Sequence, residues 1–216
     1  MLLESLDWLG HAGFRVRTRA GVLYIDPYRV EGGPKADLIL ITHAHYDHFS
    51  PQDVERLSHE RTWLVGPPAV AERVGGRVVS VAPGDVVEEE LLRGVGIAAV
   101  AAYNTSKRDG SGNHFHPRAA GWVGYELNVR GERLYHSGDT DVIPEMDSVT
   151  GVDVALLPVS GVYVMTAAEA AEAARRIGPR VAVPMHWGDQ VGTRADAEEF
   201  ARRSPVEVRI PRRAAP

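Results

Sequence analysis

Apolar and polar residues alternate along the first forty positions in a way that predicts strands separated by turns. Phe14 and Val16 alternate with Arg15 and Arg17, and the dipeptide at positions 20–21 predicts a hairpin turn. Residues 37–42 (DLILIT) are almost continuously apolar, which predicts a strand buried on both faces. Further strands are expected at residues 6–9, 22–25, 62–65, 77–82, 85–90, 96–103, 122–129, 133–136, 152–158, 180–185 and 206–210.

Helix signals lie between these strands. Ser50 and Pro51 supply an N-cap and a first-turn proline for a helix that ends near residue 58. Thr166 and Glu169 form a capping box for an alanine-rich helix that ends at residue 177. Two more helices are expected at residues 68–74 and 194–203. The order predicts an α/β (α+β) fold of two mixed sheets with helices outside.

Composition limits the class of protein. The chain has 216 residues, of which 44% are hydrophobic and 25% charged, and this predicts one domain over residues 1–216. With 24 Lys and Arg against 29 Asp and Glu, the net charge of −5 argues against a long nucleic-acid partner. The first ten residues carry Glu4 and Asp7 and no basic residue, and the longest apolar runs are too short to span a bilayer. A cytoplasmic protein without a membrane partner is expected, and self-association is left open.

The strand at residues 37–42 runs directly into His43-x-His45-x-Asp47-His48. Strand alternation aims His43 and His45 the same way, and the following turn brings Asp47 and His48 toward a second point nearby. Imidazole and carboxylate are ligands for zinc, iron, manganese and nickel, and the lack of cysteine leaves only nitrogen and oxygen donors. The motif therefore predicts a metal site.

Four ligands are too few for two metal ions, so further donors are expected from other strand ends. Asp139 and His186 each follow a predicted strand. His114 and His116 lie in residues 104–119, a segment without periodicity whose length is typical of a functional loop. The residues alone leave open which of these two histidines is a ligand.

At this point the ordered motifs resemble the metallo-β-lactamase superfamily of metal-dependent hydrolases. Finer matches resemble a branch of small hydrolases related to ascorbate-6-phosphate lactonases. They are Trp8-Leu-Gly-His-Ala-Gly-Phe14, Ile25-Asp-Pro27, Tyr135-His-Ser-Gly-Asp-Thr-Asp141 and Pro184-Met-His-Trp-Gly188. The resemblance covers nearly the whole chain and implies a four-layered αββα sandwich.

The resemblance also implies two divalent metal ions, with zinc expected first and manganese, iron or nickel as alternatives. It assigns His43, His45 and a loop histidine to the first ion, Asp47, His48 and His186 to the second, and Asp139 as a bridge. Many relatives place the loop histidine directly after the strand, where this chain has Asn104. His116 is favoured over His114, because Phe-His-Pro before a glycine-containing strand resembles one sub-branch.

Weaker candidates surround these ligands. Asp26 resembles an early aspartate that orients a histidine ligand, although Asp-Pro also starts turns. His11 resembles a residue near the same site. Tyr103, Phe115, Tyr163 and Trp187 are expected either to line a pocket or to fill the core. His136 is expected to be a buried strand residue, and His59 a surface residue. Lys107, Arg108 and Arg118 are candidates to receive an anionic substrate group, or else solvated loop residues.

These residues predict a hydrolase in which a metal-bridging hydroxide attacks a carbonyl or phosphoryl centre of a small-molecule substrate. Asp47 is the candidate catalytic carboxylate, which orients the hydroxide and accepts its proton. A lactone or ester is favoured, and an anionic group on the substrate is allowed. Three alternatives remain: a phosphodiesterase on nucleotide-like small molecules, a mononuclear iron dioxygenase of the same fold, and a metal-binding protein without activity.

Overall fold

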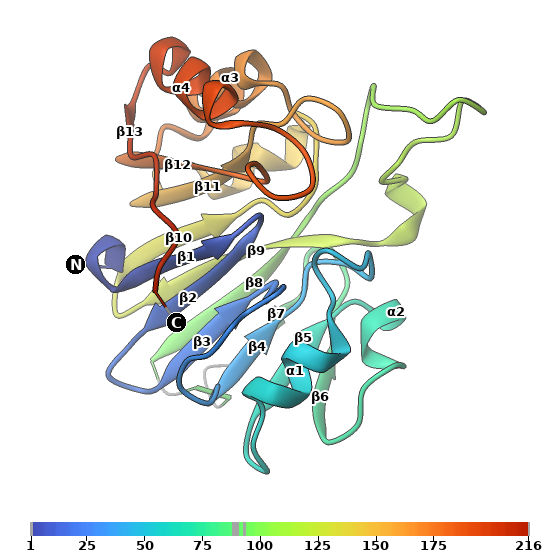
Figure 1. Ribbon diagram of the computed structural model, residues 1–216, viewed down its shortest axis with the longest axis vertical. Coiled ribbons are helices and arrows are strands. Elements are labelled where there is room, and N and C mark those ends of the chain that lie inside the picture. Colours follow the sequence, from blue (N-terminus) through green and yellow to red (C-terminus); the bar gives the residue numbers. More distant parts are fainter. Residues whose placement is uncertain (1, 88–90, 93, 216) are drawn as a thin grey trace.

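A computed structural model describes residues 2–87, 91–92 and 94–215 and shows two β-sheets packed face to face (Figure 1). The first sheet has the order β1-β2-β3-β4-β5-β6 and the second the order β13-β12-β11-β10-β9-β8-β7. The first sheet comprises β1 (Leu6–Gly10), β2 (Gly13–Arg17), β3 (Val22–Ile25), β4 (Leu38–Leu40), β5 (Trp63–Gly66) and β6 (Arg77–Ser80). The second comprises β7 (Val86–Val87), β8 (Val95–Ala101), β9 (Val123–Val129), β10 (Glu132–His136), β11 (Val154–Pro158), β12 (Val181–Met185) and β13 (Glu207–Val208).

Helices cover the outer face of each sheet, which confirms the predicted αββα sandwich. The helices α1 (Pro51–Leu57) and α2 (Pro68–Ala71) lie over the first sheet, and α3 (Ala167–Ile177) and α4 (Arg194–Arg203) lie over the second (Figure 1). Three 3-10 helices complete the elements: η1 (Leu2–Ser5), η2 (Arg118–Ala120) and η3 (Pro144–Val149). No helix in the described part of the chain has the length and apolarity that a membrane crossing requires.

The core fills two layers on either side of the first sheet. Leu38 and Leu40 of β4 face the second sheet, whereas Ile39 packs with Val54 and Leu57 of α1. All three β4 residues are fully buried, so the continuous apolar run does mark a strand enclosed on both faces. This rigid strand leads directly into the histidine motif.

The two sheets share one topological property that positions the site. β1, β3 and β4 run in the same direction in the first sheet, since β1 and β3 both pair antiparallel with β2 and β3 pairs parallel with β4. In the second sheet β8, β10, β11 and β12 likewise run together. The carboxyl ends of these strands therefore come to one edge of each sheet, where ligands of α/β folds usually bind.

Some predicted elements differ in length from the observed ones. The helix expected at residues 68–74 ends at Ala71, four residues before the first glycine of the pair at 75–76. The strand expected at 206–210 is an edge strand confined to Glu207–Val208, because only Val181 and Ala182 of β12 pair with it. The strand expected at 85–90 is observed as Val86–Val87, and residues 88–90 lie outside the described residues. The three 3-10 helices were not predicted.

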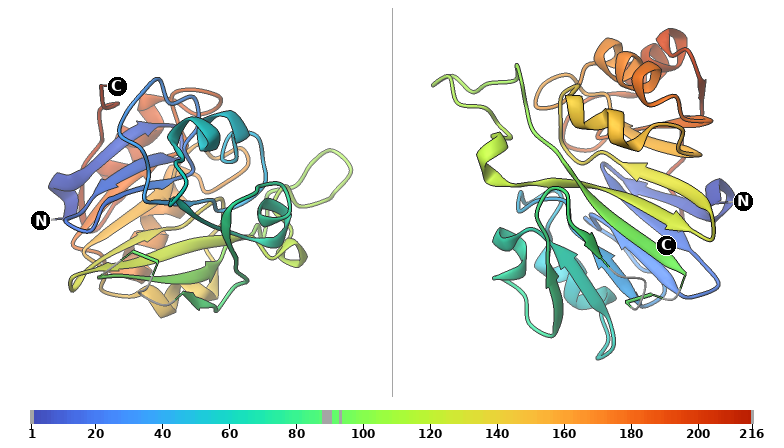
Figure 2. Two further views of the ribbon diagram at one scale, coloured as in Figure 1. Left: turned by 90° about the horizontal axis from the view of Figure 1, so that it is seen from below. Right: turned by 180° about the vertical axis from the view of Figure 1, so that it is seen from behind.

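Residues 104–119 leave the sandwich as a long excursion after β8 and return as η2 (Figure 2). Its base is held to the body, because backbone N–H groups of Thr105 and Ser106 both donate to the Asp141 carboxylate at 2.8 Å. Its far end, at residues 109–113, is exposed. The loop predicted at residues 104–119 is therefore confirmed, and His114 and His116 lie on the limb that returns to the sandwich.

Candidate metal centre

All predicted ligands except His116 lie in the turns that follow the carboxyl ends of strands. His43 follows β4, Asp139 follows β10 and His186 follows β12, while His116 lies on the returning limb of the loop that follows β8. These four side chains are at most 4% exposed, although each belongs to a different segment. The convergence of strand ends thus places donors from both sheets in one buried volume.

One group of donors consists of His43, His45 and His116, whose ligand atoms all lie within 4.8 Å of one another. His43 Nε2 and His45 Nδ1 are only 3.1 Å apart. The structure places His116 in this group and places His114 outside all the donor groups found among the described residues. Of the two loop histidines, only His116 therefore has the geometry for the first metal position.

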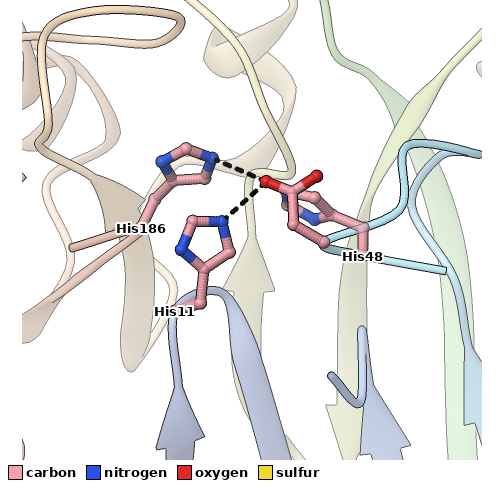
Figure 3. A group of neighbouring side chains, drawn as sticks. His11, His48 and His186 are labelled. Carbon is pink, nitrogen blue, oxygen red and sulfur yellow. Dashed lines mark hydrogen bonds and ion pairs between the residues drawn. The ribbon is translucent and has the colours of Figure 1, made fainter. Parts of the chain in front are cut away.

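A second group consists of His11, Asp47, His48 and His186 (Figure 3). His11 Nε2 lies 3.0 Å from Asp47 Oδ2, and the Nε2 atoms of His48 and His186 each lie 4.0 Å from the same oxygen. His11 is fully buried and comes from the turn after β1. His11 is therefore a member of this donor group. The sequence resemblance had placed it only near the site.

Asp139 lies between the two groups. Its Oδ1 is 3.3 Å from His48 Nε2, and its Oδ2 is 3.2 Å from His116 Nε2 and 3.0 Å from His186 Nε2. One carboxylate thus faces histidines of both groups, with a different oxygen toward His48 than toward His116. Asp139 is thus within reach of donors from both groups.

Side-chain oxygens that contact Nδ1 fix the orientation of four imidazole rings. Asp26 Oδ2 lies 2.7 Å from Nδ1 of His48, and Asn104 Oδ1 lies 3.0 Å from Nδ1 of His116. The hydroxyl oxygen of Thr42 lies 3.0 Å from Nδ1 of His43, and that of Ser160 lies 3.1 Å from Nδ1 of His186. Partners of this kind set the tautomer and aim the other ring nitrogen, as in known metal sites.

The inward ring nitrogens lack ordinary partners. Nε2 of His48, His116 and His186 and Oδ1 of Asp139 are buried and do not meet hydrogen-bond geometry, although each nitrogen lies 3.0–3.3 Å from an oxygen of Asp139. Buried polar atoms of folded proteins are nearly always paired, so four such atoms facing one another are explained by a ligand between them. The donor set fits divalent cations, because it combines imidazole nitrogen with carboxylate oxygen.

The charges of the site favour a cation. Burial alone would lower the pKa of His48, but the facing carboxylates of Asp139 and Asp26 outweigh it and hold that pKa well above its ordinary value. Burial alone would raise the pKa of Asp139, but His186 and His48 outweigh it and hold that pKa well below its ordinary value. The electrostatics of the site therefore favour positive charge at its centre.

Asp47 is ionised at neutral pH and reaches the surface of the site. Burial alone would raise its pKa, but the hydrogen bond with His11 and the charge of His48 lower it to about 2. Its side chain is 15% exposed, against 3% for Asp139. Asp47 is therefore the carboxylate of the centre that a substrate can approach.

Backbone strain is concentrated at the same place. His11, Asp26 and His186 have φ angles of 50°, 45° and 59°, a left-handed region that costs non-glycine residues about 1 kcal/mol or more. Each residue directly follows a strand, and the sharp turn directs its side chain into the centre instead of along the strand. Strain retained at three converging strand ends is typical of functional sites.

The remaining predicted residues have varied surroundings. Asp26 holds His48, as the resemblance implied. Tyr163 lines the pocket at the centre, whereas Trp187 is buried and stacks on Trp8 with ring centroids 4.7 Å apart. His136 is a buried strand residue whose Nε2 lies 2.9 Å from the Ala12 carbonyl oxygen. Trp187 and His136 thus belong to the packing around the site.

Sequence reasoning missed Thr42, Ser160 and the role of Asn104. Thr42 stands directly before the histidine motif, and that position was a usable signal. Ser160 acts across 26 positions on His186, and Asn104 acts across 12 positions on His116. These two contacts depend on tertiary structure, so no local pattern indicates them.

The centre opens into a pocket of about 220 Å³. It is lined by His45, Tyr46, Asp47, Phe115, His116, Asp139, Tyr163 and His186. A larger hollow of about 580 Å³ lies elsewhere, against β8 and β9, and includes Tyr103, Arg118 and Glu145. The smaller pocket is the candidate active site, because it alone of the two is lined by residues of the donor groups.

Comparison with known proteins identifies the class. Residues 5–186 match the family model of the β-lactamase superfamily domain. The chain therefore belongs to the metallo-β-lactamase superfamily of metal-dependent hydrolases, and the αββα sandwich is the fold of that family.

Individual relatives narrow the relationship. The chain is 34% identical to a UPF0173 metal-dependent hydrolase of Methanopyrus kandleri, over 91% of this chain and 90% of the relative. It is 33% identical to one of Thermoplasma volcanium, over 91% and 89%. Among solved structures, a protein of Parabacteroides distasonis has a TM-score of 0.83 at 30% identity, over 97% of this chain and 93% of that one. Igni18 of Ignicoccus hospitalis, a metallo hydrolase, has a TM-score of 0.75 at 25% identity, over 95% and 93%.

Proposed function

We propose that this chain is a two-metal hydrolase that cleaves a small lactone or ester. The observation that carries the proposal is the position of Asp139 between two donor groups, with His43, His45 and His116 on one side and His11, Asp47, His48 and His186 on the other. A mononuclear iron centre would leave one of these donor groups without a metal ion to bind. We expect zinc, given four or more imidazole donors, with manganese, iron and nickel as alternatives.

Two bound divalent ions would lower the pKa of a shared water toward neutrality and stabilise the oxyanion that develops when a carbonyl is attacked. Asp139 supplies negative charge where the two positions meet. The Nδ1 partners of His43, His48, His116 and His186 keep the rings in place, so little reorganisation accompanies binding.

Asp47 is the residue that handles the proton in this proposal. A bond forms between the water oxygen and the carbonyl carbon, and the bond from that carbon to the leaving oxygen breaks. One proton of the water passes to the Asp47 carboxylate and then to the leaving alcohol. His11 holds Asp47 at 3.0 Å and keeps Oδ2 facing the centre. The second water proton remains with the acid product or is released to solvent.

The test is steady-state hydrolysis by metal-loaded protein of a lactone panel, aryl esters and a bis-aryl phosphate. We expect lactone or ester turnover, and a loss of at least about 100-fold in kcat/KM for His48→Ala. His59→Ala is the matched control, since His59 lies at the surface and belongs to none of the donor groups. Circular dichroism checks that both variants are folded.

Undiminished hydrolysis by folded His48→Ala would contradict the proposed centre. Background rates with esters and lactones, together with clear turnover of the bis-aryl phosphate, would replace the lactonase or esterase by a phosphodiesterase. The resemblance of the sequence motifs to ascorbate-6-phosphate lactonases is the reason for including a lactone in the first panel.

A further inference from the structure

Aromatic side chains form the walls of the pocket beside the metal centre. Tyr46 packs edge-to-face with Tyr28, with ring centroids 6.1 Å apart. Phe115 packs edge-to-face with Tyr163, with centroids 4.8 Å apart and planes at 89°. Tyr46, Phe115 and Tyr163 line the same pocket of about 220 Å³ as Asp47 and Asp139. The pocket therefore has a charged floor and an apolar rim.

Exposed apolar groups are concentrated at this rim. Among the described residues, the exposed large hydrophobic side chains are Tyr46 (65%), Val86 (73%), Val162 (51%) and Tyr163 (41%). Three of these four belong to the rim or adjoin it in sequence, and only Val86 lies on a remote strand. Clustered exposed apolar side chains beside a concave site are typical of ligand contact.

Lysine and arginine side chains do not line this pocket, whose basic lining residues are the donor histidines His45, His116 and His186. Lys107 of the loop is instead held by Glu169 at 2.7 Å and faces Asp141 at 3.5 Å. Arg118 pairs with Glu145 at 2.9 Å and lines the separate hollow. The two basic residues best placed by sequence to receive an anion are therefore engaged by carboxylates.

Two further arginines, Arg29 and Arg108, also do not line the pocket. Arg29 lies over the ring of Tyr28, 5.1 Å from its centroid, and is not part of the pocket lining. Arg108 donates to the Gly112 carbonyl oxygen at 2.7 Å, far out on the loop. A carboxylate or phosphate on the substrate would thus meet Asp47 and would find no lysine or arginine in the lining to pair with.

Resting on the proposed hydrolase function, we propose that the substrate is an uncharged ester or lactone with an aromatic group, which lies between Tyr46 and the Phe115–Tyr163 pair. Edge-to-face contacts with these rings favour an aryl group over an alkyl group of the same size. The pocket volume of about 220 Å³ is below the range typical of drug-sized ligands, so the substrate is small. The proposal thus differs from the expectation that allowed an anionic group on the substrate.

Matched substrates test this inference. The 4-nitrophenyl esters of 4-methylphenylacetic acid and of 4-carboxyphenylacetic acid share one leaving group and differ by a methyl or a carboxylate. We expect kcat/KM to be at least about tenfold higher for the methyl compound, and about tenfold higher for it than for 4-nitrophenyl acetate, which lacks the ring. Equal or faster turnover of the carboxylate compound would overturn the inference.

Variants of the rim locate the effect. We expect Tyr163→Ala and Tyr46→Ala to reduce the preference for the aryl ester over the acetate by about fivefold or more, mainly through KM. Val86→Ala is the control, because Val86 is also an exposed apolar residue and lies on remote β7. An unchanged preference in both tyrosine variants would contradict the placement of the aryl group.

A binding measurement makes the inference independent of turnover. Saturation-transfer NMR on metal-free protein is expected to detect 4-methylphenylacetamide and to show a signal reduced at least threefold for 4-carboxyphenylacetamide and for Tyr163→Ala. Equal signals for the two amides would count against the uncharged substrate.

If metal-loaded wild type hydrolyses no ester or lactone, the proposed function fails. If it hydrolyses them without the aryl preference, only the present inference fails.

Discussion

In most histidines of this centre, one ring nitrogen contacts a neighbouring oxygen and the other faces the donor atoms of the site. Nδ1 of His43, His48, His116 and His186 faces a neighbouring oxygen, and Nε2 faces the common volume. His45 does the reverse, since its Nδ1 faces His43. The donor geometry is therefore built before any cation arrives, which lowers the ordering entropy that binding has to overcome.

Asn104 offers the sharpest test at this scale. Its Oδ1 accepts from the backbone N–H of His116 and contacts His116 Nδ1, so it carries the loop histidine to a site that the strand end itself does not reach. We expect Asn104→Ala to weaken metal binding at the first position by about 10–100-fold, as loss of such partners does in other metal sites. Competition with a chromogenic chelator measures it.

Asn113→Ala is the matched control, because Asn113 lies in the same loop and contacts only Asp109 among the hydrogen-bond partners found. The second position, which uses Asp47, His48 and His186, is expected to keep its affinity in Asn104→Ala. Two unaltered affinities in folded Asn104→Ala would show that His116 needs no support from this residue.

At the scale of elements, a close approach of backbones links β9 to the end of β10. A Cβ atom added at Gly124 would lie 2.5 Å from the His136 carbonyl oxygen and 2.6 Å from that of Ser137. We expect Gly124→Ala to lower the free energy of unfolding by about 1–3 kcal/mol, since backbone has to move. Urea unfolding measures it.

Gly75→Ala is the control for that substitution, because nothing lies within 4 Å of its Cβ position and its φ is not in the left-handed region. It is expected to change stability by less than about 0.5 kcal/mol. Equal stability of the two variants would mean that the strand crossing tolerates a methyl group.

The capping box of α3 also holds the loop, through Glu169. Its carboxylate accepts from the Thr166 backbone and from Lys107 Nζ. Burial alone would raise the pKa of Glu169, but the Lys107 and Thr166 contacts outweigh it and lower that pKa. Because the folded pKa is below the unfolded value, its stabilising contribution is complete above the unfolded value of about 4.3 and is lost as pH falls through the folded pKa.

Glu169→Gln is therefore expected to destabilise the protein by roughly 0.5–1 kcal/mol at pH 7 and by progressively less as the pH falls below about 4. Thermal unfolding of both proteins between pH 3 and 7 measures the difference. Glu172→Gln is the control, since the exposed Glu172 pairs only with Arg175 on the same helix. A difference that stays constant over this range would show that the Glu169 charge is not involved.

The sequence predicts some helices and strands well and others poorly, and it predicts only part of the site. Local signals sufficed for α4, whose bounds at Arg194–Arg203 coincide with the prediction, and for the capping box of α3. They failed for β13, where an alternating apolar and charged segment at residues 206–210 pairs over only two residues at the edge of the sheet. In the site, the histidine motif was visible because its members are close in sequence.

Contacts over long separations could not be predicted from local pattern. The distance of 3.0 Å between His11 and Asp47 joins residues 36 positions apart, and it depends on β1 and β4 ending at the same edge of one sheet. The resemblance implies a loop histidine directly after β8, at the position where this chain has Asn104. The structure shows that Asn104 takes that position and holds His116 in place.

At the scale of the whole molecule, the centre joins the two sheets. His43, His45 and Asp47 come from the first sheet, and Asp139 and His186 come from the second. Bound cations are therefore expected to stabilise the sandwich as a whole. Removal of metal by chelation should lower the melting temperature by about 5–10 °C when the loaded state is compared at 100 times the dissociation constant. Differential scanning calorimetry measures the change, and an unaltered melting temperature would contradict the fit of the donors to a metal.

The central claim is that two ions share this centre through Asp139. Elemental analysis of protein saturated with zinc and freed of excess metal tests it most directly. We predict two equivalents per chain in the wild type, and one in His116→Ala and in His186→Ala, each of which removes a donor from a different group. One equivalent in the wild type, or two in both variants, would contradict the account.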